Sequence, residues 1–191
     1  HQVPFTTIVN LTDPDAIESV WKVRTEGFGI LMAMKGDTKP LAIVDDAALP
    51  PAHLADYILQ LEDYCKQDLD HEISYFAHAS AGCLHVHNML NAKLAADIAK
   101  FPKIVTFSGD LLKKYGGVLS SEHGDGRLRS WLNPHFFGDE MYGLFKQVKG
   151  IFDPQNIFNP GNIVDAPAMT EHLRYGETYR AIPITPTLDF G

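Results

Sequence analysis

The feature that most constrains the fold is a pair of short, strand-like segments joined by a turn of small residues. Residues 73–77 and 83–90 are rich in apolar, aromatic and β-branched side chains, a composition typical of strands. The intervening residues, 78–82, read His-Ala-Ser-Ala-Gly, and small residues of this kind favour a turn. The sequence therefore predicts a β-hairpin, or an adjacent strand pair, in the middle of the chain.

Helical segments and one further strand flank this pair. Residues 13–28 have apolar side chains at helical spacing, preceded by an aspartate and a proline suited to an N-cap and first turn. Residues 40–49 contain an apolar run that ends in two aspartates and predict a strand. Two prolines then open an amphipathic helix that is expected to end near Lys66.

The second half of the chain reads as helix, loop and helix. Residues 91–115 are helical in pattern, and Pro102 must kink or break the helix because it lacks an N–H. Residues 120–129 predict a Gly-rich loop, and residues 134–152 predict another helix. We therefore expect an α+β fold with an antiparallel sheet and helices packed on one face. One domain over residues 1–165 and a Pro-punctuated tail or linker over 166–191 complete the prediction.

Composition excludes several classes of protein. The apolar share of 45% and charged share of 21% are those of an ordinary globular protein. A formal charge of −8 argues against binding nucleic acid or an anionic membrane, and no apolar run approaches the roughly 20 residues of a membrane span. Without a leader pattern, a cytoplasmic location is expected. Cys65 and Cys83 are expected to be reduced thiols, and a start at His1 rather than Met suggests a piece of a longer polypeptide.

Histidines and one Glu-His pair carry the predicted chemistry. His78, His85 and His87 lie within ten residues, and Glu122 and His123 follow in the Gly-rich loop. Imidazoles with a carboxylate suit a divalent metal, and three protein ligands leave a position open for substrate. His85 and His87 are two apart and share a strand face. A single histidine is more often an ordinary polar residue, but the grouping favours a site.

Other candidates are weaker taken alone. The loop glycines Gly124 and Gly126 fit a close ligand approach or an ordinary surface turn. Arg24 lies on the first predicted helix and is suited either to pairing with a substrate carboxylate or to a solvated helix face. Lys39 has the same two interpretations. Neither a G-x-G-x-x-G nor a G-x-x-x-x-G-K-[ST] motif is present, so a self-contained nucleotide site, and with it a parallel doubly wound fold, is disfavoured.

Four motifs in order resemble the C-terminal domain of FAD-linked oxidases, a family that includes D-lactate, glycolate and D-2-hydroxyglutarate dehydrogenases. Residues 21–24 resemble its W-x-x-R helix, and residues 78–85 resemble its H-x-G-D-G-N-L-H motif. Residues 121–126 resemble its E-H-G-x-G loop, and residues 153–161 resemble its D-P-x-x-x-x-N-P-G close. Residues 169–175 resemble a continuation found in large bacterial forms that carry an iron-sulfur module.

The resemblance implies a ferredoxin-like cap that covers the substrate, with FAD held mostly by an N-terminal domain of the same polypeptide. It implies that His78, His85 and Glu122 are ligands of a divalent metal, usually zinc, and that His123 is the catalytic base. Arg24 then binds the carboxylate of a 2-hydroxy acid, and Asn159 approaches the flavin or closes the helix before it. The reaction is oxidation of the hydroxy acid, with hydride passing to FAD.

Three departures from the family pattern bear on substrate choice. Residues 80–82 read Ser-Ala-Gly where the family has Gly-Asp-Gly, and His87 stands where it has Asn. Val44 stands where the family has a lysine, and Lys39 is the candidate to replace it in binding a distal carboxylate. Two other functions stay open, a metal-dependent hydrolase that uses Glu122 or His123 to activate water, and a non-catalytic module that keeps only the fold.

Overall fold

The computed structural model describes residues 9–180, 182, 185 and 187. The chain divides into two compact units, which are His1–Gly36 and Asp37–Gly191. The described part of the first unit is dominated by one helix, α1 (Pro14–Met32). Asp13 caps this helix by accepting a hydrogen bond from the Ala16 N–H at 2.9 Å, and Pro14 occupies the first turn. The predicted helix is confirmed and extends further than expected.

The second unit is built on a three-stranded antiparallel sheet in the order β1-β3-β2. Its strands are β1 (Lys39–Ala48), β2 (Ile73–His78) and β3 (Cys83–Leu90). The predicted hairpin is confirmed, since β2 and β3 pair from Ile73↔Asn88 to His78↔Cys83. Strand β3 therefore lies between the other two and receives hydrogen bonds from both.

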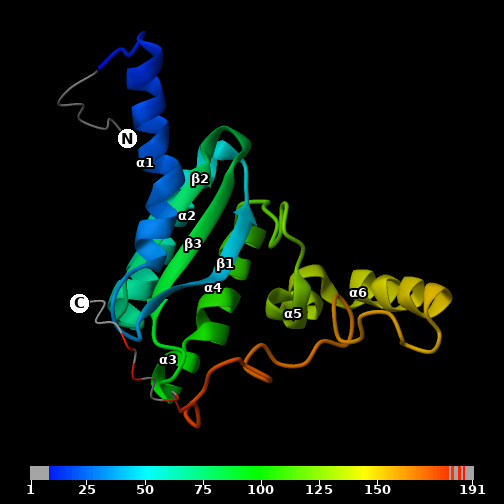
Figure 1. Cartoon of the computed structure of the whole chain (residues 1–191). Coiled ribbons are helices and arrows are strands. Elements are labelled where there is room, and N and C mark those ends of the chain that lie inside the picture. Colours follow the sequence, from blue (N-terminus) through cyan, green and yellow to red (C-terminus); the bar gives the residue numbers. More distant parts are fainter. Residues whose placement is uncertain (1–8, 181, 183–184, 186, 188–191) are drawn as a thin grey trace. The chain divides into compact units, whose positions relative to one another are not determined.

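Helices α2 (Leu54–Asp63) and α4 (Phe101–Lys114) lie on the same side of the sheet (Figure 1). A π-helical turn, Tyr64–Asp68, extends α2. The order β1-α2-β2-β3-α4 is a split β-α-β unit followed by a helix, as in ferredoxin-like folds. The predicted α+β class with helices on one face is confirmed. The core between the layers includes Ile43, Tyr57, Leu61, Leu84, Val86, Ile104 and Leu112.

Pro102 separates two helices, as predicted. The short helix α3 (Ala95–Ile98) precedes it, and Pro102 itself lies in the first turn of α4, where its missing N–H has no intrahelical partner to lose. The predicted loop 120–129 is partly wrong, because its last residues form one helical turn, α5 (Gly126–Arg129). Helix α6 (Asn133–Phe152) follows and is interrupted at Gly138, whose φ of 77° is not helical.

Two close backbone contacts fix the turns that flank the end of β1. Gly82 has a φ of 73°, and a Cβ there would collide with the carbonyl oxygen of Leu49. After α4, Val118 pairs with Ala48 through N–H···O distances of 2.7 and 3.1 Å. The hairpin turn and the loop that begins at Ser120 are thereby both held beside the last residues of β1.

Among the described helices, none has a sufficiently long apolar stretch to cross a bilayer.

Candidate metal and catalytic site

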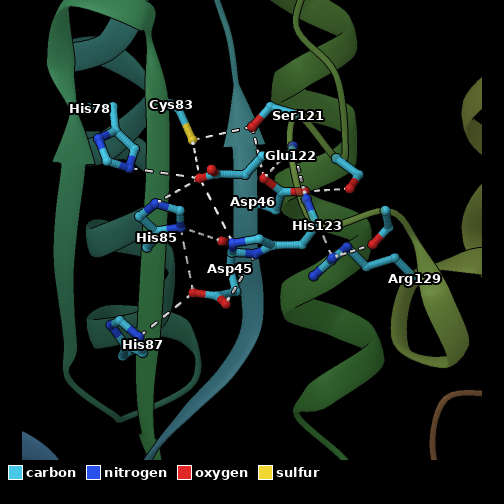
Figure 2. A network of polar contacts seen from close by, with 12 residues as sticks. Asp45, Asp46, His78, Cys83, His85, His87, Ser121, Glu122, His123 and Arg129 are labelled. Atoms are coloured by element: carbon cyan, nitrogen blue, oxygen red, sulfur yellow. Dashed lines mark hydrogen bonds and ion pairs between the residues drawn. The ribbon is translucent and has the colours of Figure 1, made fainter. Parts of the chain in front are cut away.

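The predicted metal ligands lie together on the sheet face opposite to α2 and α4. His78 ends β2 beside Cys83, and His85 pairs across the hairpin with Phe76. The rings of His78 and His85 are perpendicular, with centroids 5.2 Å apart. Figure 2 shows the Glu122 carboxylate approaching both rings from the loop that follows α4.

Distances within this group are compatible with three ligands of one cation. The Glu122 Oε1 atom lies 3.1 Å from His85 Nε2 and 3.8 Å from His78 Nε2. One ligand atom from each of the three residues lies within 4.8 Å of the others. His78 and Glu122 are about half exposed whereas His85 is mostly buried, so the group is open on one side. Two imidazoles and one carboxylate are donors that zinc or another divalent cation accepts.

The tautomer of His85 supports this choice of ligands. His85 Nδ1 lies 2.7 Å from the main-chain oxygen of Asp45, so Nδ1 carries the proton and donates it to that oxygen. The lone pair is then on Nε2, the atom that faces Glu122. A metal-binding histidine commonly donates its other N–H to a carbonyl or carboxylate, which fixes its ring.

Asp46 positions the loop that carries Glu122 and His123. Its side chain is fully buried, and its carboxylate accepts the hydroxyl of Ser120 and, at 2.7 Å, that of Ser121. The main-chain N–H groups of Glu122 and His123 donate to it at 3.0 and 2.8 Å. Burial alone acts to raise the pKa of Asp46, but these hydrogen bonds outweigh it and lower the pKa to about 2.

His123 lies beside the ligand group and in contact with a second carboxylate. Its ring stacks on that of His85 with centroids 5.3 Å apart. Its Nδ1 is 3.5 Å from Asp45 Oδ2, and its Nε2 is 3.8 Å from Glu122 Oε1. An imidazole with a carboxylate near each ring nitrogen is a candidate for general-base chemistry.

The chain belongs to a family of oxidase domains that its sequence identifies directly. The family described as "FAD linked oxidases, C-terminal domain" matches residues 1–163. This chain is a FAD-linked oxidase C-terminal domain.

Relatives of this FAD-linked oxidase domain are much longer proteins. "D-2-hydroxyglutarate dehydrogenase" of Escherichia coli is 36% identical over 88% of this chain, and the match spans 17% of that relative. The protein of the same name from Pseudomonas putida is 39% identical over 78% of this chain and 14% of the relative. "D-lactate dehydrogenase" of Archaeoglobus fulgidus is 32% identical over 70% of this chain and 29% of the relative. The domain therefore spans a minor part of the relatives it matches.

The other predicted substrate residues come from three different elements, His87 from β3, Lys39 from β1 and Arg24 from α1. His87 is 3% exposed, and its Nε2 lies 3.6 Å from Asp45 Oδ1; burial lowers its pKa, with an opposing effect of Asp45. Lys39 lies at the opposite end of β1 from Asp45, up to about 20 Å along the strand, in a pocket of about 160 Å³ with Lys93 and two tyrosines. Arg24 lies three residues after Trp21 on α1, so the W-x-x-R pair shares one helix face.

Asn159 belongs to the loop that follows α6. Its backbone has a φ of 47°, and its Oδ1 accepts a hydrogen bond from Asn162 Nδ2 at 2.9 Å. The aspartate of the same motif, Asp153, ends the helix by accepting the main-chain N–H groups of Ile157 and Phe158, each at 2.9 Å. The D-P-x-x-x-x-N-P-G motif thus closes α6 through Asp153, while the flavin contact of Asn159 stays a prediction.

Three residues of the site were not predicted, namely Asp45, Asp46 and Cys83. Both cysteines are free thiols, as predicted, and the Cys83 thiol lies 3.2 Å from Ser121 Oγ and 3.6 Å from Glu122 Oε1. Burial, the largest effect, raises the pKa of Cys83, which keeps it a neutral thiol. The available signal for the two aspartates was their position directly after an apolar run, because acidic side chains in a partly buried strand need polar partners.

Proposed function

We propose that this domain forms the substrate-capping part of a flavin-dependent dehydrogenase that oxidises a D-2-hydroxy acid of the lactate, glycolate or 2-hydroxyglutarate type. The names of its relatives support this reaction class. FAD would be held mainly by an N-terminal domain of the same polypeptide, and an iron-sulfur module would follow downstream. The small share of each relative that the domain covers supports such additional parts.

The convergence of His78, His85 and Glu122 beside the imidazole of His123 is the observation that carries the proposal. Four side chains from the hairpin and from a distant loop come together there, and their imidazole and carboxylate groups are of the kind that divalent cations accept. On an ordinary polar surface, we would not expect an aspartate to be buried beneath a loop. Both oxygens of the Asp46 carboxylate nevertheless accept hydrogen bonds there.

Each residue has a distinct role in this proposal. His78, His85 and Glu122 hold the cation, which would supply Lewis-acid chemistry by polarising an oxygen of the substrate. His123 holds at Nε2 the proton that leaves the substrate hydroxyl. The flavin would supply the redox chemistry by accepting a hydride. Arg24, Lys39 and His87 remain candidates for the substrate carboxylates, and Asn159 for the flavin.

Elemental analysis of the purified chain tests the ligand set. We expect one zinc or other divalent ion per chain, and its loss from both His85→Ala and Glu122→Ala with the circular dichroism spectrum unchanged. His135→Ala is the matched control, because His135 also contacts a carboxylate, that of Asp110 at 2.7 Å, but lies outside the site. Retention of the metal by both ligand variants would contradict the assignment.

Activity has to be measured on the full-length flavoprotein that contains this domain. We expect reduction of FAD by at least one of D-2-hydroxyglutarate, D-lactate and glycolate, and a loss of about 100-fold or more in kcat for His123→Asn. Unchanged turnover in His123→Asn with metal still bound would favour a module without catalytic chemistry. Hydrolytic activity of the isolated domain without flavin would instead favour a metal-dependent hydrolase.

A further inference from the structure

The adjacent aspartates of β1 point in different directions. Asp46 is turned toward the loop beyond α4, whereas the carboxylate of Asp45 faces three imidazoles. Asp45 Oδ1 lies 3.6 Å from His87 Nε2 and 3.8 Å from His85 Nδ1. Asp45 Oδ2 lies 3.5 Å from His123 Nδ1. Figure 2 shows Asp45 between the histidines of β3 and the ring of His123.

The two aspartates lie in an irregular part of β1. The register between β1 and β3 shifts between Leu41 and Val44 and again between Val44 and Ala47. An extra residue in a strand breaks the strict alternation of side chains and re-aims one of them, which is a frequent feature beside active sites. The second shift contains both aspartates, of which Asp46 is buried under the loop and Asp45 contacts the histidines.

A role for Asp45 as a metal ligand is disfavoured by the same contacts. Asp45, His85 and His123 also bring ligand atoms within 4.8 Å of one another. The His85 nitrogen nearest to the carboxylate is Nδ1, however, and it is already bonded to the Asp45 main-chain oxygen at 2.7 Å. His85 therefore offers its lone pair to the other group, on the side of Glu122.

We propose that Asp45 is a positioning residue, whose Oδ2 holds His123 in the tautomer protonated at Nδ1 and so presents the Nε2 lone pair to the substrate hydroxyl. His87 contacts the other carboxylate oxygen and limits rotation of Asp45. The Nε2 atom of His123 faces Glu122, on the open side of the ligand group. This inference rests on the proposed function only for the role of His123 as base.

The tautomer of His123 tests the inference without metal or flavin. In ¹⁵N-labelled chain, at a pH where the imidazoles are neutral, long-range ¹H–¹⁵N spectra report which ring nitrogen carries the proton. We expect protonated Nδ1 in the wild-type chain and in Asp110→Asn, which removes the carboxylate beside His135. In Asp45→Asn, His123 should shift to Nε2–H or a mixture. The same His123 tautomer in Asp45→Asn and the wild type would overturn the inference; Asp45→Ser answers the same question if Asp45→Asn does not fold.

Kinetics of the full-length flavoprotein give a second readout. We expect Asp45→Asn to lower kcat about 100-fold or more with KM and metal content unchanged, and Asp45→Glu to recover part of the loss. Equal kcat in Asp45→Asn and the wild type would overturn the role. If the wild-type protein itself holds no metal and oxidises no hydroxy acid, the proposed function fails, while the tautomer measurement still decides whether Asp45 orients His123.

Discussion

The two faces of β3 differ in what holds their side chains. Leu84, Val86 and Leu90 face α2 and α4 and are nearly fully buried in the apolar core. Cys83, His85 and His87 alternate with them and face the polar cluster, which we define as Asp45, Asp46, Glu122 and His123. A strand has a side-chain period of two, so eight residues contribute to a core on one side and to a ligand set on the other.

The core face of β3 contributes to stability, and its histidine face contributes to the proposed chemistry. The core face gains stability from apolar contacts with neighbours that only have to match in shape and volume. The histidine face depends on particular atoms supplied by β1 and by the loop after α4, including the Asp45 main-chain oxygen and the Asp46 carboxylate. Substitutions on the two faces should therefore have different consequences for stability and for metal binding.

Leu84→Ala should have the largest effect on folding. The side chain is fully buried between the sheet and the helices, and a Leu→Ala change in such a core costs about 2 to 5 kcal/mol. Urea unfolding followed by circular dichroism measures the loss. Leu94→Ala is the control, since Leu94 is largely exposed. Equal losses of unfolding free energy in the two variants would contradict the role of the core face in stability.

Asp46→Asn should come next, because Asp46 is the structural member of the polar cluster. Loss of a charged acceptor shared by two hydroxyls and two main-chain N–H groups should cost roughly 2 to 3 kcal/mol. The lowered pKa also has a defined sign. Since the folded protein releases this proton more readily than an ordinary aspartate at 3.8, the carboxylate stabilises the fold fully above about pH 4, and the contribution falls away as the pH drops toward 2.

The free energy of unfolding, measured as a function of pH, tests whether the lowered pKa of Asp46 contributes to stability. Wild-type stability should fall between pH 4 and pH 2 more steeply than that of the variant, in which the titrating group is absent. Asp110→Asn serves as the control, because Asp110 is exposed. Parallel pH profiles for wild type and Asp46→Asn would show that the hydrogen bonds of Asp46 contribute little.

Tyr57→Phe tests a polar contact on the core side of the sheet, where most contacts are apolar. Tyr57 is fully buried, and its hydroxyl lies 2.6 Å from Ser108 Oγ; burial raises its pKa, so it stays protonated. Removing the hydroxyl leaves Ser108 without this partner and should cost about 1 kcal/mol. Thermal unfolding of Tyr57→Phe, of Ser108→Ala and of the double variant measures the coupling. A coupling of zero would mean that the contact between Tyr57 and Ser108 adds nothing to the stability of the core.

His85→Ala should have the smallest effect on folding and a complete effect on metal binding. In the metal-free chain, we expect the free energy of unfolding to change by less than about 1 kcal/mol, because residues at functional sites are seldom chosen for stability. Added zinc should raise the melting temperature of the wild type and not that of His85→Ala. If His85→Ala destabilised the metal-free chain as much as Leu84→Ala, the histidine face would be part of the structural core.

Local patterns in the sequence determined most of the elements and the residue types of the site. Apolar periodicity, proline positions and the small-residue turn predicted α1, the three strands, the break at Pro102 and the final helix, because these signals act over a few neighbouring residues. The spacing of His85 and His87 on a strand likewise placed them on one face. The four motifs predicted the family, which the match to residues 1–163 confirmed.

Tertiary structure alone decided how those residues are used. Glu122 reaches His85 only because the segment after α4 pairs with the end of β1, a contact between residues 70 apart in the chain. The different roles of Asp45 and Asp46 depend on long-range partners, because one carboxylate contacts the histidines of β3 and the other the loop after α4, and no local pattern reveals these contacts. The sequence therefore specified which groups take part, and long-range packing specified which atoms of those groups meet.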